Sequence, residues 1–368
     1  MRYSLLAVGA LLLAVAAPAA ERWRIRYFYD TPEDATFNIF DIAFSSPERG
    51  MAVGSLSSSS RREKPYAVAT ADGGATWTPV RLPDFPISLF FLNDKAGWLA
   101  GRDNIWYTAD FGESWKKLGR APGTLRVHFR DEQRGWALGT KKAVRETSDG
   151  GATWRDVAAA AQPEANPENT VYAAVAFANP DAGMIAGWSR PPRRGVRAEV
   201  PDWVDPETVR REWPGLSIML ETKDGGSHWT VGQTSMFGQV TNLSLAPDGR
   251  GLGLIEFFEK FDYPSEVYRI EWRTGKTARV FRRKDRAVTD VLLLPEGPAY
   301  LAAIEPPGTM LHSPIPGKLK ILKSGNLDLW EEMPVDYRAV ARRATLAAAG
   351  SRMWAATDTG MILELVSE

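Results

Sequence analysis

The sequence predicts an all-β chain folded as a seven-bladed β-propeller, and three repeated features carry that prediction. An eight-residue phrase occurs four times, as "TADGGATW" (70–77), "TADFGESW" (108–115), "TSDGGATW" (147–154) and "TKDGGSHW" (222–229). A short apolar run, most often opened by a glycine, recurs seven times, from "RGMAVG" (49–54) to "SRMWAAT" (351–357). Each unit holds four short strand-like runs in roughly 40 residues, which is typical of a propeller blade.

The two ends of the sequence predict how the ring closes. The last unit runs out at its third strand, "MILELVSE" (361–368), and lacks a fourth. The N-terminal region supplies an unassigned strand, "RWRIRYFYD" (22–30). Because an unpaired sheet edge invites aggregation, we expect Trp23–Tyr29 to pair beside Met361–Val366 as the outer strand of the last blade.

The repeated phrase predicts a structural turn between the third and fourth strands of a blade. Its Asp accepts hydrogen bonds from N–H groups of its own turn, its second Gly suits a positive φ, and its Trp enters the gap between blades. A catalytic or metal-binding role is disfavoured, because four acids spread around a ring cannot converge on one substrate. The structural set is Asp72, Gly74, Trp77, Asp110, Gly112, Trp115, Asp149, Gly151, Trp154, Asp224, Gly226 and Trp229.

Residues 1–19 have the features of a secretory signal peptide, and residues 20–368 form a single propeller domain in this interpretation. A short basic start precedes an almost purely apolar run over residues 5–17, and Ala17 and Ala19 complete a small-residue cleavage site. We therefore expect export to the periplasm or the extracellular space. No later stretch approaches the roughly 18 apolar residues of a spanning helix, so we expect no membrane span once the signal is removed.

Composition narrows the function classes. The chain has no Cys, which excludes disulfides, thiolate metal sites, a Cys nucleophile and a lipid anchor on Cys. Lys+Arg and Asp+Glu both number 45, so we expect no nucleic-acid partner. The three histidines, His128, His228 and His312, form neither a metal motif nor a triad by their spacing. No phosphate-binding, dinucleotide or nucleophile-elbow motif appears, and we expect a monomer without cofactor or metal.

The lengths of the insertions predict a binding face. In an antiparallel blade, the turns after strands one and three lie at one end of the ring, and the loops after strand two and the crossings between blades lie at the other. Every long insertion falls at this second end, and the longest spans about 189–215 in blade 4. Long loops on a rigid scaffold concentrate binding residues, and Arg and Trp are typical of interfaces. The candidates are Arg190, Arg193, Arg194, Trp203, Arg210, Arg211 and Trp213.

Alternatives remain open at this face. Trp203 and Trp213 either bind a partner or hold the loop against the ring, and residues 205–213 have the pattern of a short helix that starts at an Asp-Pro pair. The crossing from blade 5 to blade 6 carries four basic residues that either extend a basic patch or coat a surface edge. These are Arg282, Arg283, Lys284 and Arg286. The clustered carboxylates that suit glycoside hydrolysis are Glu256, Glu259 and Asp262, which surface solubility explains equally well.

With its repeats laid out, the chain resembles the BNR (Asp-box) propellers of the photosystem II stability and assembly factor family. The likeness rests on the repeated phrase, on units such as "AGWLAG" (96–101) and "RGWALG" (134–139), and on the exported N-terminus. It implies a non-enzymatic scaffold that binds partner proteins, and we predict that role for the face opposite the repeated turns. The alternative is a glycan-binding protein or a glycoside hydrolase of the sialidase or xyloglucanase Asp-box type.

Overall fold

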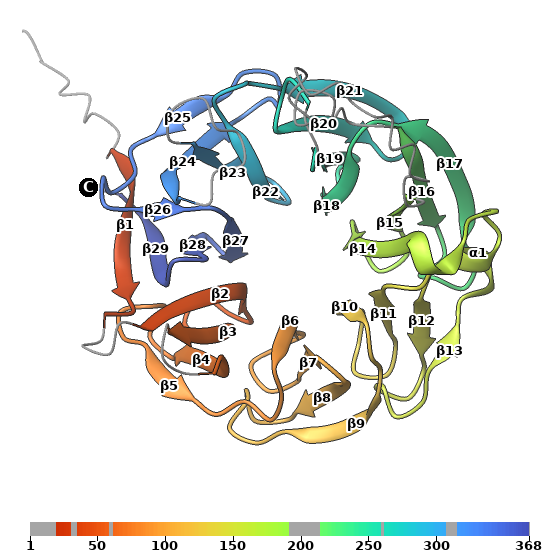
Figure 1. Cartoon of the computed structure of the whole chain (residues 1–368), viewed down its shortest axis with the longest axis horizontal. Helices are drawn as coiled ribbons and strands as arrows, with labels where there is room; N and C mark the ends of the chain where they lie inside the picture. The colour runs from red at the N-terminus through yellow and green to blue at the C-terminus, as the bar shows by residue number, and fades with distance from the viewer. Residues whose placement is uncertain are drawn as a thin grey trace, which may run out of the picture.

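The computed structural model describes residues 20–30, 35–58, 62–190, 214–258, 261–306 and 315–367. Seven antiparallel sheets surround a central axis like the blades of a propeller (Figure 1). Each blade has four strands, which run in chain order from the axis outward in blades 1 to 6, whereas blade 7 takes its outermost strand from the N-terminus; blade 6 carries one additional short strand. The predicted fold class and blade number are confirmed.

The first three blades follow the chain without interruption. Their strands are β2 (Ala35–Phe44), β3 (Gly50–Ser58), β4 (Lys64–Thr70) and β5 (Thr78–Val80) in blade 1; β6 (Pro86–Phe91), β7 (Gly97–Gly101), β8 (Asn104–Thr108) and β9 (Lys116–Arg120) in blade 2; and β10 (Thr124–Phe129), β11 (Gly135–Gly139), β12 (Val144–Thr147) and β13 (Arg155–Asp156) in blade 3. The crossing to blade 4 holds the helix α1 (Ala158–Ala161) and the 3₁₀ turn η1 (Pro167–Asn169).

The last four blades complete the ring. Their strands are β14 (Thr170–Phe177), β15 (Gly183–Ser189), β16 (Gly215–Thr222) and β17 (Thr230–Met236) in blade 4; β18 (Gln239–Leu245), β19 (Arg250–Glu256), β20 (Ser265–Glu271) and β21 (Lys276–Phe281) in blade 5; β22 (Ala287–Leu293), β23 (Ala299–Glu305), β24 (Gly317–Ser324), β25 (Glu331–Met333) and β26 (Val340–Ala341) in blade 6; and β27 (Ala344–Ala349), β28 (Arg352–Thr357), β29 (Met361–Ser367) and β1 (Glu21–Phe28) in blade 7.

The N-terminal strand closes the ring as predicted. β1 runs antiparallel to β29, from Glu21 opposite Ser367 to Phe28 opposite Met361. The backbone of Trp23 also bonds to blade 6, because its N–H donates to the carbonyl of Pro334 at 2.8 Å and its carbonyl accepts from the N–H of Asp336 at 2.9 Å. The two ends of the chain are therefore held together by a complete outer strand, without a disulfide.

Aromatic pairs between neighbouring blades form much of the core. Trp98 on β7 stacks on Phe129 of the next blade with ring centroids 3.7 Å apart, and Trp354 on β28 stacks on Phe44 at 3.4 Å. The Phe ring lies over the glycine that opens its own second strand, so that a Cβ on Gly135 would come within 2.4 Å of Phe129. This contact recurs between Phe and Gly in blades 1 to 4 and explains the glycine near the start of each second strand; in blade 5, Leu245 lies over Gly251 in the same way.

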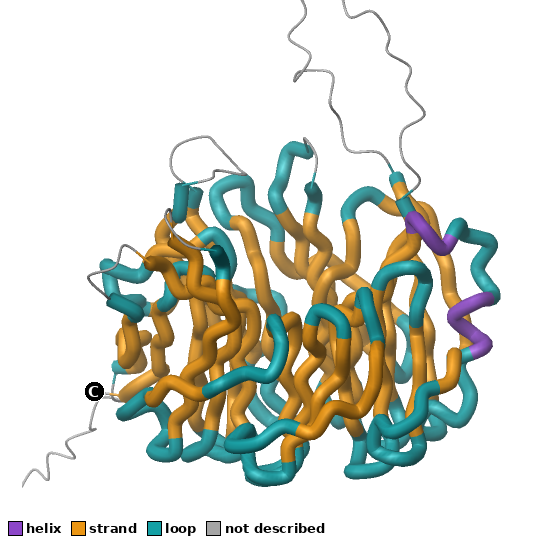
Figure 2. The backbone as a smooth tube through the Cα atoms, turned by 60° about the horizontal axis from the view of Figure 1, so that its bottom comes forward, coloured by secondary structure: helices purple, strands orange, loops and turns teal. Residues whose placement is uncertain are grey.

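The two ends of the ring differ in their connections (Figure 2). We call the end that carries the four repeated turns the turn face, and the end that carries the crossings between blades and the loops after each second strand the loop face. Short turns follow strands one and three at the turn face. Among the described residues, no helix is long and apolar enough to cross a membrane, and residues 1–19 of the expected signal peptide lie outside them.

Candidate binding face

The carboxylates of the four repeated turns are occupied within their own turns. Asp149 accepts hydrogen bonds from the backbone N–H of Thr153 at 2.8 Å and from its hydroxyl at 2.6 Å, and the hydroxyl of Thr147 donates at 2.8 Å. The same Thr147 hydroxyl accepts from the N–H of Gly151, whose φ is 96°. Asp72, Asp110 and Asp224 repeat this arrangement. Each carboxylate thus stabilises one turn of one blade.

The hydrogen bonds of these turns also set their protonation. Donation from the Thr153 side chain and backbone lowers the pKa of Asp149 to about 2, and donation from the Thr76 side chain and backbone does the same for Asp72. In the fourth turn, the backbone and ring of His228 lower the pKa of Asp224 to about 2. All three carboxylates are therefore ionised at neutral pH. Among the described residues, no group of three His, Asp or Glu is arranged to hold a metal ion.

The Trp residues of these turns are less buried than their place in the repeat suggests. Trp77, Trp115, Trp154 and Trp229 are half-buried against the preceding blade, whereas Trp98, Trp136 and Trp354 on second strands are fully buried. Trp229 meets Trp136 edge-on with centroids 6.0 Å apart. The second-strand tryptophans thus form the inner part of each gap, and the turn tryptophans cover its outer part.

Most of the predicted binding loop lies outside the described residues. This holds for Arg193, Arg194, Trp203, Arg210, Arg211 and Trp213, and for the expected helix over 205–213. Arg190 is described: it directly follows β15 on the loop face, and its N–H donates to the carbonyl of Asn169 at 3.0 Å. The base of the insertion is thereby anchored to the crossing that enters blade 4.

The basic residues of the crossing from blade 5 to blade 6 are paired with acids. Arg286 is almost fully buried and donates to Glu332 at 2.6 Å and to Glu305 at 3.3 Å. Arg283 bonds to Asp285 at 2.7 Å. Arg282 bonds to Glu266 at 3.1 Å and lies over the ring of Tyr263, as does Lys284. These residues therefore form neither a free basic patch nor a simple surface coat. They belong to a mixed-charge network, in which acids from three other segments neutralise their charge.

An exposed aromatic group occupies the loop face above blades 4 and 5. We call Phe237, Phe257, Phe258 and Phe261 the phenylalanine cluster. Phe237, on the crossing between the blades, is 45% exposed and lies 5.7 Å from Phe261, which stacks on buried Phe257 at 4.1 Å; Phe258 is 50% exposed. Sequence reasoning missed this group, although three of its members stand together in "EFFEKF" (256–261).

Ion pairs cross the axial channel between blades that are not neighbours. Arg126 on β10 of blade 3 reaches Asp41 on β2 of blade 1 at 3.0 Å. Closer to the loop face, Arg343 at the entry to blade 7 forms two hydrogen bonds, of 2.8 and 3.1 Å, with Glu256 at the end of β19 in blade 5. Glu256 is thus held by a bidentate arginine. Of the other carboxylates considered for glycoside hydrolysis, Glu259 lies outside the described residues and Asp262 is exposed.

A buried acid faces the same channel. Asp290 on β22 accepts hydrogen bonds from the N–H groups of Leu346 at 2.6 Å and Val291 at 2.9 Å, and from the Asn242 amide. Burial outweighs these bonds and raises the pKa of Asp290 to about 6, and burial likewise raises the pKa of Asp41. Each acid links the inner strands of two adjacent blades. Asp41 of blade 1 accepts a hydrogen bond from the N–H of Leu89 in blade 2, and Asp290 of blade 6 accepts one from the N–H of Leu346 in blade 7.

The two described histidines, His128 and His228, are each held by a neighbouring side chain. His128 is stacked on Phe177 with centroids 5.0 Å apart, and burial lowers its pKa to about 4, so that it is neutral at pH 7. His228 takes the place that Thr or Ser holds in the other repeated turns and bonds to Asp224 at 2.6 Å. His312 lies outside the described residues.

Comparisons with known proteins agree with this architecture. The family model described as "Photosynthesis system II assembly factor YCF48" matches residues 117–191, which run from β9 into blade 4. The photosystem II stability/assembly factor HCF136 of Arabidopsis thaliana is 24% identical over 301 residues, covering 73% of this chain and 68% of that protein. The chain is similar to the photosystem II assembly factors.

Two further matches extend this similarity. The photosystem II assembly lipoprotein Ycf48 of Synechococcus sp. (strain CC9902) is 30% identical over 152 residues, which cover 38% of this chain and 43% of that protein. A solved structure described as "YCF48 bound to D1 peptide" superposes with a TM-score of 0.60 at 18% identity, covering 96% of this chain and 97% of that chain. At this identity, the structural match establishes the propeller fold.

Proposed function

We propose that this chain is an exported propeller scaffold that binds a partner protein through its loop face. The observation that carries the proposal is the phenylalanine cluster, which exposes Phe237 and Phe258 on segments held by rigid strands. Aromatic side chains are enriched in the cores of protein interfaces because they bury a large area at a low cost in conformational entropy. On the turn face, by contrast, the four repeated carboxylates accept hydrogen bonds within their own turns.

The surroundings of the cluster support the same role. The mixed-charge network of Arg282, Arg283 and Glu266 lies at the same end of the ring, where it provides a polar rim beside an apolar centre. Relatives named as assembly factors, and a similar structure described as bound to a D1 peptide, support a protein as the partner class. The residues that would contact a partner in this chain are proposed from its own geometry alone.

Cross-linking in the native host tests this proposal. The variant Phe237→Ala/Phe258→Ala is expected to lose at least about tenfold of its cross-linked partner, because interface aromatics commonly contribute 2 kcal/mol or more. Leu329→Ala is the matched control, since Leu329 is 72% exposed on the turn face. Equal recovery of the partner by both variants, with unchanged melting temperatures, would contradict the loop face as the binding surface.

The blade 4 insertion is tested separately. Changing Arg193, Arg194, Trp203 and Trp213 together to Ala is expected to abolish co-purification of the partner and to leave the melting temperature nearly unchanged. Retention of the partner by this variant would remove the insertion from the binding surface and leave the phenylalanine cluster as the candidate.

The proposed export rests on the sequence of residues 1–19. N-terminal sequencing of the chain recovered from the periplasm or the medium is expected to begin at Ala20. The variant Leu12→Arg, which places a charge in the apolar run, is expected to keep the chain in the cytoplasm with its first 19 residues attached. Cytoplasmic recovery of the unaltered chain would contradict export.

A further inference from the structure

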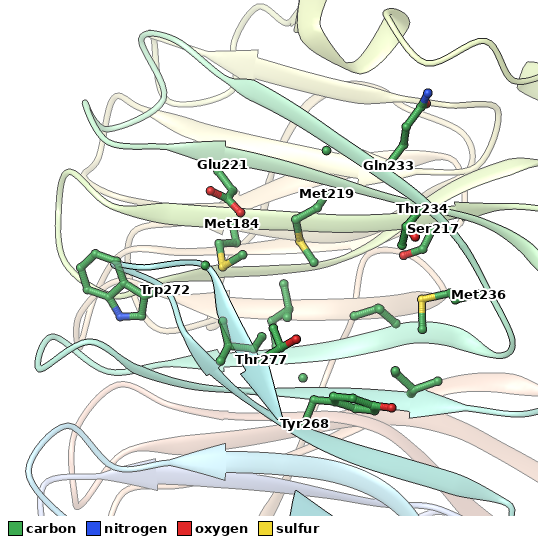
Figure 3. A pocket seen from close by; sticks show the side chains of 17 residues that line it. Met184, Ser217, Met219, Glu221, Gln233, Thr234, Met236, Tyr268, Trp272 and Thr277 are labelled. Atoms are coloured by element: carbon green, nitrogen blue, oxygen red, sulfur yellow. The ribbon is translucent and has the colours of Figure 1, made fainter. Parts of the chain in front are cut away.

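The gap between blades 4 and 5 contains a cavity of about 420 Å³ (Figure 3). Met184, Met219, Met236, Tyr268 and Trp272 are among the residues that line it, and their side chains come from both blades. The lining also includes exposed residues of the outer strands β17 and β21, so the cavity opens at the rim of the ring. A volume of 300–1,000 Å³ with mostly apolar walls is the usual range of a ligand site.

Strand register explains why this gap is not filled. In blade 4, Glu221 pairs with Thr230, so that Trp229 stands opposite Thr222 at the end of the third strand. In blade 5, Ile270 at the corresponding position pairs with Thr277. Thr277 therefore occupies the place of the turn Trp and lines the cavity.

The other six gaps each hold an indole at this position. In blade 7 it is Trp23, which pairs with Leu365 and packs edge-on against Tyr300 of blade 6. In blade 6 it is Trp330, which packs against Phe281 of blade 5. The full set around the ring is Trp77, Trp115, Trp154, Trp229, Trp330 and Trp23, with Thr277 as the exception.

The inner part of the same gap has also lost its aromatic side chains. Met184 stands where blades 2, 3 and 7 have Trp98, Trp136 and Trp354, and Leu245 stands where the stacking Phe of the neighbouring blade lies. Two aromatic rings are therefore replaced by flexible aliphatic side chains. Methionine adapts its shape and makes favourable sulfur contacts with aromatic rings, so the remaining walls suit an aromatic guest.

Polar groups in the cavity remain available to a guest. Within the described part of the chain, the side chains of Glu221, Gln233 and Thr234 have no hydrogen-bond or ion-pair partner, although all three line the cavity. Glu221 lies at the same end of the cavity as Trp272 in Figure 3. A carboxylate beside an aromatic slot can accept the N–H of an indole or of a peptide backbone.

We propose that this cavity binds a tryptophan side chain of a partner polypeptide, which takes the place that the turn Trp holds in the other gaps. The ring itself provides the precedent, because Trp23 reaches its gap on a strand from the opposite end of the sequence. The inference rests on the proposed protein-binding function and adds a second contact at the rim.

Methionine-methyl NMR on the full mature chain tests the proposal. The probe is the peptide acetyl-Thr-Trp-Thr-amide, with acetyl-Thr-Ala-Thr-amide and free indole as comparison ligands. The Trp peptide is expected to shift the methyl signals of Met184, Met219 and Met236 and to leave those of Met51 and Met353, which are buried elsewhere, unchanged. The Ala peptide is expected to shift none of them.

A matched pair of variants locates the binding. Thr277→Trp supplies the missing indole from within and is expected to weaken peptide binding at least tenfold. Ala278→Trp places the same side chain one residue along β21, on the opposite side of the strand, and is expected to leave binding unchanged. Unaltered binding by Thr277→Trp would overturn the proposal.

The remaining outcomes separate the possible occupants. Binding of free indole without binding of the Trp peptide would mean a small-molecule site, and concentration-dependent Met shifts without any peptide would mean a second copy of the chain. Either result overturns the proposal, as does the absence of any shift. If Thr277→Trp keeps the native partner while Phe237→Ala/Phe258→Ala loses it, this inference fails and the proposed loop-face function stands.

Discussion

Two neighbouring gaps of the same ring differ in how they are closed. Between blades 3 and 4, Trp229 packs edge-on against Trp136, which stacks on Phe177 at 4.7 Å. Between blades 4 and 5, the equivalent residues are Thr277 and Met184, and a cavity of about 420 Å³ remains. The strands, their pairing and the number of blades are unchanged, so one gap of a closed ring can lose its aromatic filling and keep its architecture.

The difference separates two functions of the repeat. Where the phrase is intact, its Asp and Trp hold the third and fourth strands to each other and to the preceding blade. Where it has been lost, a four-residue turn at Trp272–Gly275 still connects β20 and β21, but Thr277 stands in the place of the turn Trp and leaves a cavity. The Trp of the repeat therefore fills its gap locally, and its replacement by Thr277 in blade 5 leaves a cavity.

The largest effect is expected where an outer-strand indole also closes the ring. Trp23→Ala should lower the free energy of unfolding by about 4 kcal/mol, since a fully buried Trp is removed. Phe28→Ala on the same strand is the control, because Phe28 is half-exposed and should cost less than about 1 kcal/mol. Denaturant unfolding measures both, and equal losses would contradict the importance of the gap.

The two compared gaps should respond differently to truncation. Trp229→Ala should destabilise by about 2–3 kcal/mol, less than a fully buried Trp because Trp229 is only partly buried. Thr277→Ala should change stability by less than about 0.5 kcal/mol, as is usual for a surface substitution without partners. If Thr277→Ala proved as damaging as Trp229→Ala, the cavity would not be an unfilled gap.

The free energy of unfolding should depend on pH, because a buried acid, Asp290, faces the axial channel. The pKa of Asp290 is about 6 in the fold and 3.8 in its reference state. The native state therefore binds more protons between these values, and stability should fall by roughly 3 kcal/mol as the pH rises from about 4 to about 6. Asp290→Asn should flatten this slope, and Asp262→Asn, at an exposed carboxylate, should not.

The turn aspartates make stability depend on pH in the opposite direction. The folded-state pKa of Asp72, Asp149 and Asp224 is about 2, below the reference value of 3.8, so the stability that they contribute is present above about pH 4 and is lost as the pH falls toward 2. Asp149→Asn should weaken the acid dependence below pH 4 and leave the slope between pH 4 and 6 unchanged. Melting curves across this range distinguish the two sets of acids.

A smaller effect than those of the buried tryptophans, and one that raises stability, is expected from filling the gap between blades 4 and 5. Thr277→Trp should stabilise the chain by about 1–2 kcal/mol, in the usual range for filling a cavity. Full burial of an indole would contribute more, but part of that gain is offset by the ordering of Met184 and Met219 around the ring. A destabilised variant in thermal melts would show that the cavity does not have the shape of the other gaps.

The repeats in the sequence were sufficient to predict the blades and the closure of the ring. The spacing of the glycine runs is local information, and the missing fourth strand could be assigned to Trp23–Tyr29 because closure leaves no other edge. The half-burial of Trp77 and its equivalents was not predicted, because it depends on the second-strand Trp of the preceding blade.

The cavity and the charge networks required the structure. The equivalent stretch of blade 5, residues 270–277, has the same eight-residue length as the repeated phrase but keeps neither its Asp nor its Trp, so only strand register identifies Thr277 as the position of the missing Trp. The partners of Arg126 and Arg343 lie 85 and 87 residues away, in blades that are not adjacent. Such pairs arise from the geometry of a closed ring, and no local pattern in the sequence predicts them.

A crystal structure of Thr277→Trp tests the central claim most directly. The introduced indole is expected to lie in the gap between blades 4 and 5, against Met184 and Met219, in the orientation that Trp229 has in the preceding gap, with the ring otherwise unchanged. An indole that points to solvent, or a blade 5 displaced to admit it, would contradict the claim that this gap is an unoccupied tryptophan site.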